Sequence, residues 1–133
     1  MAGSFVTVIS CIDGRVQQPL GEWARTAYGA EHADMVTRPG CDQVLSDGTP
    51  DAEAEVRRDV DVSVRAHAPA AIVVSGHHDC AANPATQSHH VDQIARAVDR
   101  VRGWGADVPV VGVWVDEHWQ VHRVAGDEPP PAG

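Results

Sequence analysis

The sequence predicts an α/β fold: a single domain with a mainly parallel sheet of about four strands, a C-terminal antiparallel strand, and helices covering the faces. Short β-branched runs alternate along the chain with longer segments of helical periodicity. The last two strand-like runs are separated only by a short turn, which favours an antiparallel pair. The length of 133 residues suits one compact domain better than two.

The strand-like runs are residues 5–11, 34–38, 71–75, 108–115 and 119–124. The first of them, FVTVISC, lacks deep polar alternation, so we expect both of its faces to be buried, as in a parallel sheet. The Pro39-Gly40 pair ends the second run. Asp116-Glu117 forms the predicted turn into the last one.

Helices are predicted at residues 19–28, from Thr49 to Pro69, and from Ser88 to Gly105. Pro19 suits the first turn of the first helix. In the second helix Thr49 is the expected cap, and valines spaced by four residues form its apolar stripe. In the third helix Ser88 is the expected cap, and Gly105 lies where a helix-ending glycine belongs.

Composition and charge exclude several classes of partner. The formal net charge is −9, and all 10 basic residues are arginines, so the chain lacks the clustered positive charge that nucleic acid or an anionic membrane surface requires. No apolar run approaches the roughly 18 residues that span a bilayer, and the first residues lack the basic start of a secretory signal. We therefore expect a cytoplasmic protein whose partner is a small molecule.

Two short motifs follow two of the predicted buried strands. Cys11, Asp13 and Arg15 form the pattern C-x-D-x-R after the first strand, and His77 and Cys80 form H-x-x-C after the third. In a parallel α/β sheet, ligands collect at the carboxyl ends of the strands. Two thiolates and an imidazole are ligands that Zn²⁺ binds in tetrahedral geometry, with a fourth position left open in catalytic sites. The motifs therefore predict a zinc site at this edge of the sheet.

The motifs CIDGR (11–15) and SGHHDC (75–80) resemble the two signatures of the β-class carbonic anhydrases, in the same order and each after a buried strand. The segment ADMVTRPGC (33–41) is similar to the family segment between them, and VVGVWVDEHWQVHRV looks like the closing strand pair. The resemblance spans most of residues 4–124. It implies a carbonic-anhydrase-like zinc domain at 1–125, followed by a flexible Pro-rich tail at 126–133.

The resemblance implies reversible hydration of carbon dioxide to bicarbonate by a zinc-bound hydroxide. Cys11, His77 and Cys80 would bind one zinc ion, and Asp13 and Arg15 would be the catalytic pair that governs its fourth position. The family's closed form further implies that Asp13 could move onto the zinc. A homodimer or a larger homo-oligomer is also implied.

The chain departs from the family at several positions. Ala81 follows the second motif where the family usually has glycine, and Cys41 stands where a small polar residue is common. The chain also begins almost directly with its first strand. Three alternatives therefore stay open: hydrolysis of carbonyl sulfide or carbon disulfide at the same site, a non-catalytic zinc module closed by Asp13 or Cys41, and a metal-free redox pair of Cys11 and Cys80.

The remaining conspicuous side chains are expected to have structural roles. We predict that Cys41 is a spare thiol and that His89 and His90 are solvated residues at a helix start. The tryptophans are predicted to anchor the core or an interface: Trp23, Trp104, Trp114 and Trp119.

Overall fold

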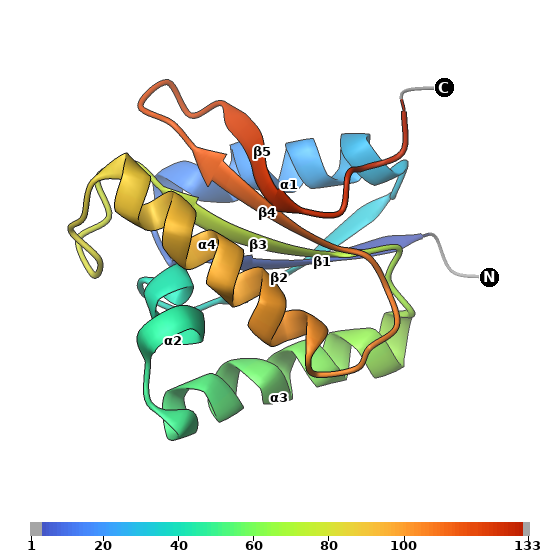
Figure 1. The fold of residues 1–133 in the computed structure, drawn as a ribbon. Coiled ribbons are helices and arrows are strands. Elements are labelled where there is room, and N and C mark those ends of the chain that lie inside the picture. Colours follow the sequence, from blue (N-terminus) through green and yellow to red (C-terminus); the bar gives the residue numbers. More distant parts are fainter. Residues whose placement is uncertain (1–3, 132–133) are drawn as a thin grey trace.

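The computed structural model describes residues 4–131, and within them the chain forms one five-stranded sheet and four helices (Figure 1). The elements follow in the order β1 (Phe5–Ser10), α1 (Gly14–Tyr28), β2 (His32–Thr37), α2 (Cys41–Asp47), α3 (Pro50–His67), β3 (Ile72–His77), α4 (Gln87–Arg102), β4 (Val110–Val115) and β5 (Val121–Gly126). The predicted α/β class and the mainly parallel sheet are confirmed.

The sheet has the strand order β2-β1-β3-β4-β5. The first four strands are parallel, and β5 pairs antiparallel with β4. Every residue of β3 and β4 is buried, because helices cover both faces and a parallel strand in this position has no face in water. The chain runs from β1 to β2 on one side and then returns to β3 on the other side of β1. The carboxyl ends of β1 and β3 therefore flank the point where the strand order reverses.

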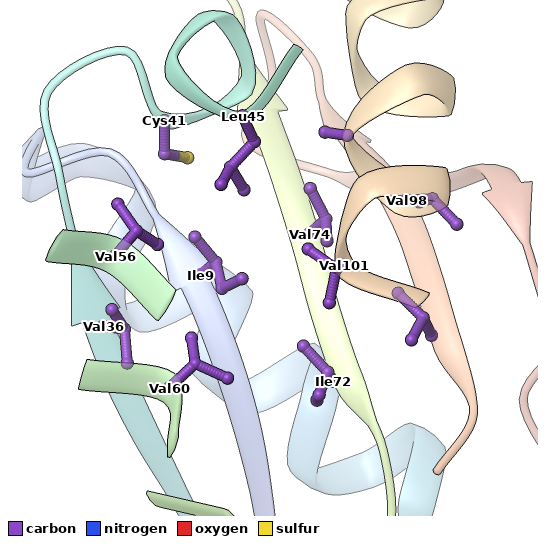
Figure 2. Close-up of a cluster of buried hydrophobic side chains, with 12 residues drawn as sticks. Ile9, Val36, Cys41, Leu45, Val56, Val60, Ile72, Val74, Val98 and Val101 are labelled. Atoms are coloured by element: carbon purple, nitrogen blue, oxygen red, sulfur yellow. The ribbon is translucent and has the colours of Figure 1, made fainter. Parts of the chain in front are cut away.

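Two apolar layers cover the two faces of the sheet. Helix α1 packs on one face and α2, α3 and α4 on the other (Figure 1). Side chains alternate along a strand, so Val8 faces the α1 layer whereas its neighbour Ile9 faces the opposite layer. Figure 2 shows this second layer, where Leu45 of α2 and Val56 of α3 pack with Ile9 and Val74.

Helix α1 begins at Gly14, five residues earlier than predicted. The carboxylate of Asp13 accepts a hydrogen bond from the backbone N–H of Arg15 and caps the helix. Pro19 therefore lies inside the helix and not in its first turn. Proline has no N–H to donate, so the helix forgoes one backbone hydrogen bond at this position.

Other predicted boundaries also need correction. The short helix α2 was not predicted, since its N-cap is Gly40 in the left-handed conformation and no side chain caps it. Helix α4 is capped by Thr86 and not by Ser88, because the Thr86 hydroxyl accepts the hydrogen bond from the His89 N–H. Its C-cap is Gly103, two residues before the predicted Gly105.

The predicted tail begins where β5 ends. Asp127 remains attached to β4: its backbone N–H donates to the Val110 carbonyl at 2.9 Å, and its carboxylate accepts from the Val110 N–H at 3.0 Å. Residues 132–133 of the predicted flexible tail lie outside the described residues. Among the helices of residues 4–131, none combines the length and the apolar character needed to cross a membrane.

Candidate metal centre

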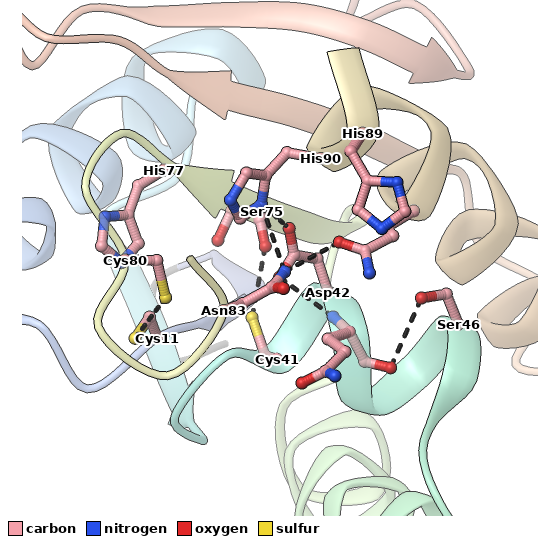
Figure 3. A network of polar contacts seen from close by, with 12 residues as sticks. Cys11, Cys41, Asp42, Ser46, Ser75, His77, Cys80, Asn83, His89 and His90 are labelled. Carbon is pink, nitrogen blue, oxygen red and sulfur yellow. Dashed lines mark hydrogen bonds and ion pairs between the residues drawn. The ribbon is translucent and has the colours of Figure 1, made fainter. Parts of the chain in front are cut away.

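The structure brings Cys11, His77 and Cys80 together at one edge of the sheet (Figure 3). Cys11 directly follows β1, His77 ends β3, and Cys80 lies in the loop after β3. Because β1 and β3 are parallel neighbours, their carboxyl ends open on the same side. One ligand atom from each of the three side chains lies within 4.8 Å of the others, and all three residues are buried.

The spacing of these atoms fits a tetrahedral metal ion. Cys11 Sγ and Cys80 Sγ are 3.9 Å apart. With Zn–S bonds of about 2.3 Å, tetrahedral geometry places two thiolate sulfurs about 3.8 Å apart, whereas a disulfide requires about 2.05 Å. Both cysteines are free thiols in the structure. The donor set of two sulfurs and one nitrogen therefore fits Zn²⁺.

The His77 ring is oriented for metal binding. Its Nδ1 lies 2.7 Å from the backbone carbonyl oxygen of His78, which only accepts hydrogen bonds, so Nδ1 carries the proton. The other nitrogen, Nε2, is buried and has no hydrogen-bond partner within the described part of the chain. An unpartnered buried polar atom is costly, and ligand histidines commonly use this same backbone contact to fix their orientation. A metal ion on Nε2 would satisfy the ring.

The environment distinguishes the two thiols. Burial disfavours the Cys11 thiolate, but the neighbouring His77 ring and the backbone amides of Gly40 and Asp13 outweigh this effect and lower the pKa of Cys11 to about 7. For Cys80, burial and the nearby charge of Cys11 raise the pKa to about 11. A cation between the two sulfurs would favour both thiolates, so metal binding would release protons.

Asp13 and Arg15 form a bidentate pair beside these ligands. Arg15 Nε donates to Asp13 Oδ1 at 3.0 Å and Nη2 donates to Oδ2 at 2.7 Å. The hydrogen bonds from Arg15 lower the pKa of Asp13 to about 2, and the same pairing raises the pKa of Arg15. Asp13 is therefore ionised at neutral pH, and Arg15 determines where its carboxylate points.

A small apolar cavity of about 170 Å³ opens beside Cys11 and Asp13. Its other lining residues are Ile12, Pro39, Ala81 and Ala82. These side chains offer no charge or hydrogen-bonding group. The cavity is suited to a small uncharged molecule held close to the carboxylate of Asp13.

Gly40 closes this side of the centre. It has a φ of +60°, and a Cβ added there would lie 3.3 Å from the Cβ of Ala82. Both the left-handed conformation and the close approach favour glycine. The predicted Pro39-Gly40 turn thus places a backbone amide at Cys11 and packs against the loop that follows Cys80.

A buried polar network lies next to the metal ligands, and the sequence did not reveal it (Figure 3). His90 Nδ1 donates to Asp42 Oδ2 at 2.6 Å, and Asn83 Nδ2 donates to Asp42 Oδ1 at 3.1 Å and to Gln93 Oε1 at 2.7 Å. His90 is only 1% exposed, so the prediction of a solvated residue is wrong. The available signal was that His90 and Gln93 share the apolar face of α4 with Ile94.

Cys41 lies outside the ligand cluster. Its thiol donates a hydrogen bond to the carbonyl oxygen of Ser75 at 3.2 Å. Complete burial raises the pKa of Cys41 well above its usual value. Cys41 therefore remains a neutral thiol in this position.

Comparison with known proteins identifies the family. Residues 1–125 match the family model described as "Putative carbonic anhydrase". The chain belongs to this carbonic anhydrase family. The resemblance predicted from the two motifs is confirmed, and the match extends over both of them. A search of curated proteins gave no match.

Solved carbonic anhydrases share the fold at low sequence identity. A carbonic anhydrase from Glaciozyma antarctica is 14% identical, with a TM-score of 0.60 over 90% of this chain and 81% of that one. One of two tetrameric β-carbonic anhydrases from Sordaria macrospora is 13% identical, with a TM-score of 0.56 over 92% and 81% of the two chains. A β-carbonic anhydrase from Aspergillus fumigatus gives 16% identity and a TM-score of 0.50 over 93% and 76%. These similarities show a common fold.

Proposed function

We propose that this chain is a zinc enzyme that reversibly hydrates carbon dioxide to bicarbonate. The observation that supports the proposal most directly is the placement of a Cys-His-Cys cluster beside an ionised, arginine-held Asp13 and a small apolar cavity. Membership of the carbonic anhydrase family supports the same reaction.

Cys11, His77 and Cys80 would hold one zinc ion per chain. Zinc, when bound, lowers the pKa of a coordinated water from about 15.7 toward 7 and so supplies a hydroxide nucleophile at neutral pH. The backbone contact at His77 Nδ1 keeps Nε2 free for the metal. The burial of all three ligands keeps bulk water away from the sulfurs and the ring.

Asp13 would orient the attacking oxygen. An ionised carboxylate only accepts hydrogen bonds, so Asp13 would accept the proton of the nucleophile and turn its lone pair toward the substrate carbon. Arg15 keeps Asp13 charged and bound by two side-chain hydrogen bonds, which opposes its movement onto the metal. This geometry supports the catalytic pair over the alternative in which Asp13 closes the metal site.

The walls of the cavity favour an uncharged, linear substrate. Ile12, Pro39 and Ala82 present apolar atoms, and Ala81 adds a methyl group where the family usually has glycine. Carbonyl sulfide and carbon disulfide have the same shape and lack of charge as carbon dioxide, and their hydrolysis is the second candidate function. The lining supports both candidates.

Metal content and turnover, measured together, test the proposal. The purified protein should contain one zinc per chain and should hydrate carbon dioxide in a stopped-flow assay that follows proton release. We expect Asp13→Asn to keep its zinc and lose activity by roughly 10²-fold or more. Cys80→Ser should lose the metal, whereas the matched variant Cys41→Ser should keep it, because that thiol lies outside the cluster.

The same assays separate the alternatives. Stoichiometric zinc without turnover and without inhibition by azide would replace the enzyme with a structural zinc module. Turnover of carbonyl sulfide or carbon disulfide, with none of carbon dioxide, would select the second candidate. A protein purified under reducing conditions without any zinc would support the redox pair of Cys11 and Cys80 and contradict the proposal.

The assembly, domain limits and compartment also belong to the proposal. We infer a homodimer or a larger homo-oligomer built from the zinc domain at 1–125, in a reducing cytoplasmic compartment. The free thiols support the compartment, and the tetrameric title of the Sordaria macrospora structures supports the assembly. Light scattering coupled to size-exclusion chromatography tests the assembly: a monomeric mass would contradict it.

A further inference from the structure

Arg15 is held by three separate loops at the edge of the sheet. Besides its two side-chain hydrogen bonds to Asp13, Nη1 donates to Asp79 Oδ2 at 3.2 Å and Nη2 donates to the Asp79 carbonyl oxygen at 3.1 Å. The Arg15 guanidinium carbon lies 4.8 Å from the centre of the Trp119 ring, within the range of a cation–π interaction. Asp79 belongs to the loop after β3, and Trp119 to the turn between β4 and β5.

Both outer partners of Arg15 have backbone conformations that such residues rarely adopt. Asp79 has a φ of +58° and Trp119 a φ of +61°. A bulky residue such as tryptophan in the left-handed region is an outlier that the surrounding structure must stabilise. Two of the four non-glycine residues with positive φ in residues 4–131 therefore contact the same guanidinium.

Asp116 stabilises the turn that carries Trp119. Its Oδ1 accepts hydrogen bonds from the backbone N–H groups of His118 and Gln120, each at 2.9 Å. The Trp119 N–H donates to the Asp116 carbonyl oxygen at 3.0 Å, and His122 Nε2 lies 2.6 Å from Asp116 Oδ2. These contacts over-determine a short turn and direct its tryptophan toward Arg15.

We propose that Trp119 is a positioning residue for the Asp13–Arg15 pair. Its ring covers the Arg15 guanidinium and holds it against Asp13, while Asp79 binds the same group from the neighbouring loop. Trp119 thereby couples the β4–β5 turn to the orientation of the carboxylate at the metal centre. This inference deepens the proposed function and rests on it only for its effect on turnover.

Nuclear magnetic resonance of the arginine side chain tests the inference in the zinc-loaded protein. The Nε–H signal of Arg15 is assigned by its loss in Arg15→Lys, and its hydrogen exchange with water is then measured. The variant Trp119→Gly removes the ring, while glycine adopts a φ of +61° without strain, so the turn is kept. We expect exchange of Arg15 Nε–H to accelerate about two- to fivefold and its ring-current shift to disappear.

Two further variants separate positioning from general structure. Trp119→Phe retains an aromatic face, so exchange should return toward the wild-type rate. Trp104→Leu removes the ring that faces Arg57 at 5.9 Å and should leave the Arg15 signal unchanged. An Arg15 exchange rate and chemical shift that are the same in Trp119→Gly as in the wild type would overturn the inference.

Turnover gives a second and separable readout. In Trp119→Gly we expect kcat for carbon dioxide hydration to fall about two- to fivefold, with zinc content and KM unchanged, and Trp119→Phe should recover it. If the zinc-loaded wild-type protein shows no turnover, the proposed function fails and the exchange rates alone decide the role of Trp119. If turnover is normal in Trp119→Gly while the exchange rate rises, the ring holds Arg15 without positioning Asp13, and the inference is overturned.

Discussion

Asn83 connects the loop that follows Cys80 to the buried network behind the metal centre, and Asn83→Ala tests what this network contributes to stability. The two N–H groups of its side chain are both used, one by Asp42 Oδ1 at 3.1 Å and the other by Gln93 Oε1 at 2.7 Å. Both acceptors belong to side chains that are only 2% exposed. Truncation to alanine therefore removes donors from buried acceptors that water does not reach.

The expected loss follows from what each acceptor keeps. Gln93 Oε1 has no other donor among the described residues, and a buried unsatisfied acceptor costs about 1–3 kcal/mol. Asp42 keeps its bonds from His90 Nδ1 and from the Gln43 N–H, so it loses one charge-assisted bond, worth about 1.5–3 kcal/mol. We expect the free energy of unfolding to fall by about 3 kcal/mol, a large part of the roughly 5–15 kcal/mol of a typical domain.

Urea unfolding of the metal-free protein, followed by tryptophan fluorescence, measures this loss. With an m-value of about 2 kcal/mol/M, the midpoint should fall by about 1.5 M in Asn83→Ala while m stays constant. The matched control is Gln18→Ala, which truncates an exposed amide bonded to Glu22 at 3.2 Å and should change stability by less than about 0.5 kcal/mol. Equal midpoints for the two variants would refute the network's role.

Three further perturbations test other parts of the fold. A Cβ at residue 76 would lie 2.4 Å from Asp42 Oδ2, so Gly76→Ala should destabilise by about 1–3 kcal/mol in thermal melts; Gly14→Ala, at a position with open space, should not. Leu45→Ala removes a fully buried side chain and should cost about 2–5 kcal/mol in urea unfolding, against less than about 0.5 for Val62→Ala, whose side chain is 56% exposed. The hydrogen bonds from His122 and the Gln120 amide lower the pKa of Asp116 to about 2, so its stabilising contribution is present above pH 4 and is lost as the pH falls toward 2. The stability difference between wild type and Asp116→Asn should therefore shrink over this pH range, and a constant difference would contradict the assignment.

The parts of the fold that the sequence predicted are those governed by burial. Strands with both faces covered must be apolar along their length, so β3 and β4 are evident from their valine-rich runs. Helix α2 was missed because it has seven residues, no side-chain cap and too little length for periodicity to show. The start of α1 was placed too late because Pro19 suggested a first turn, whereas the cap at Asp13 begins the helix earlier.

The metal ligands were predictable for a different reason. Their spacing within each motif is local, and the order of strands and helices predicts that the motifs meet. The partners of Asp42 and Arg15 come from remote segments, so no local pattern reveals them. His90 is 48 residues from Asp42, and Asp79 is 64 from Arg15. The left-handed conformation of Trp119 is equally invisible, because a tryptophan at that φ depends on the turn that Asp116 stabilises.

The strand order itself explains why one edge of the sheet collects this chemistry. After β1 the chain crosses to β2, and α1 covers one face; it then passes through α2 and α3 on the other face before entering β3. The connections leaving β1 and β3 therefore diverge and leave space between the two strand ends, where a ligand can lie without displacing a helix. The antiparallel β4–β5 turn extends past the same edge and reaches Arg15 through Trp119. The parallel strands thus determine where a metal ion could bind, and the final hairpin supplies a contact to the side chains that would act beside it.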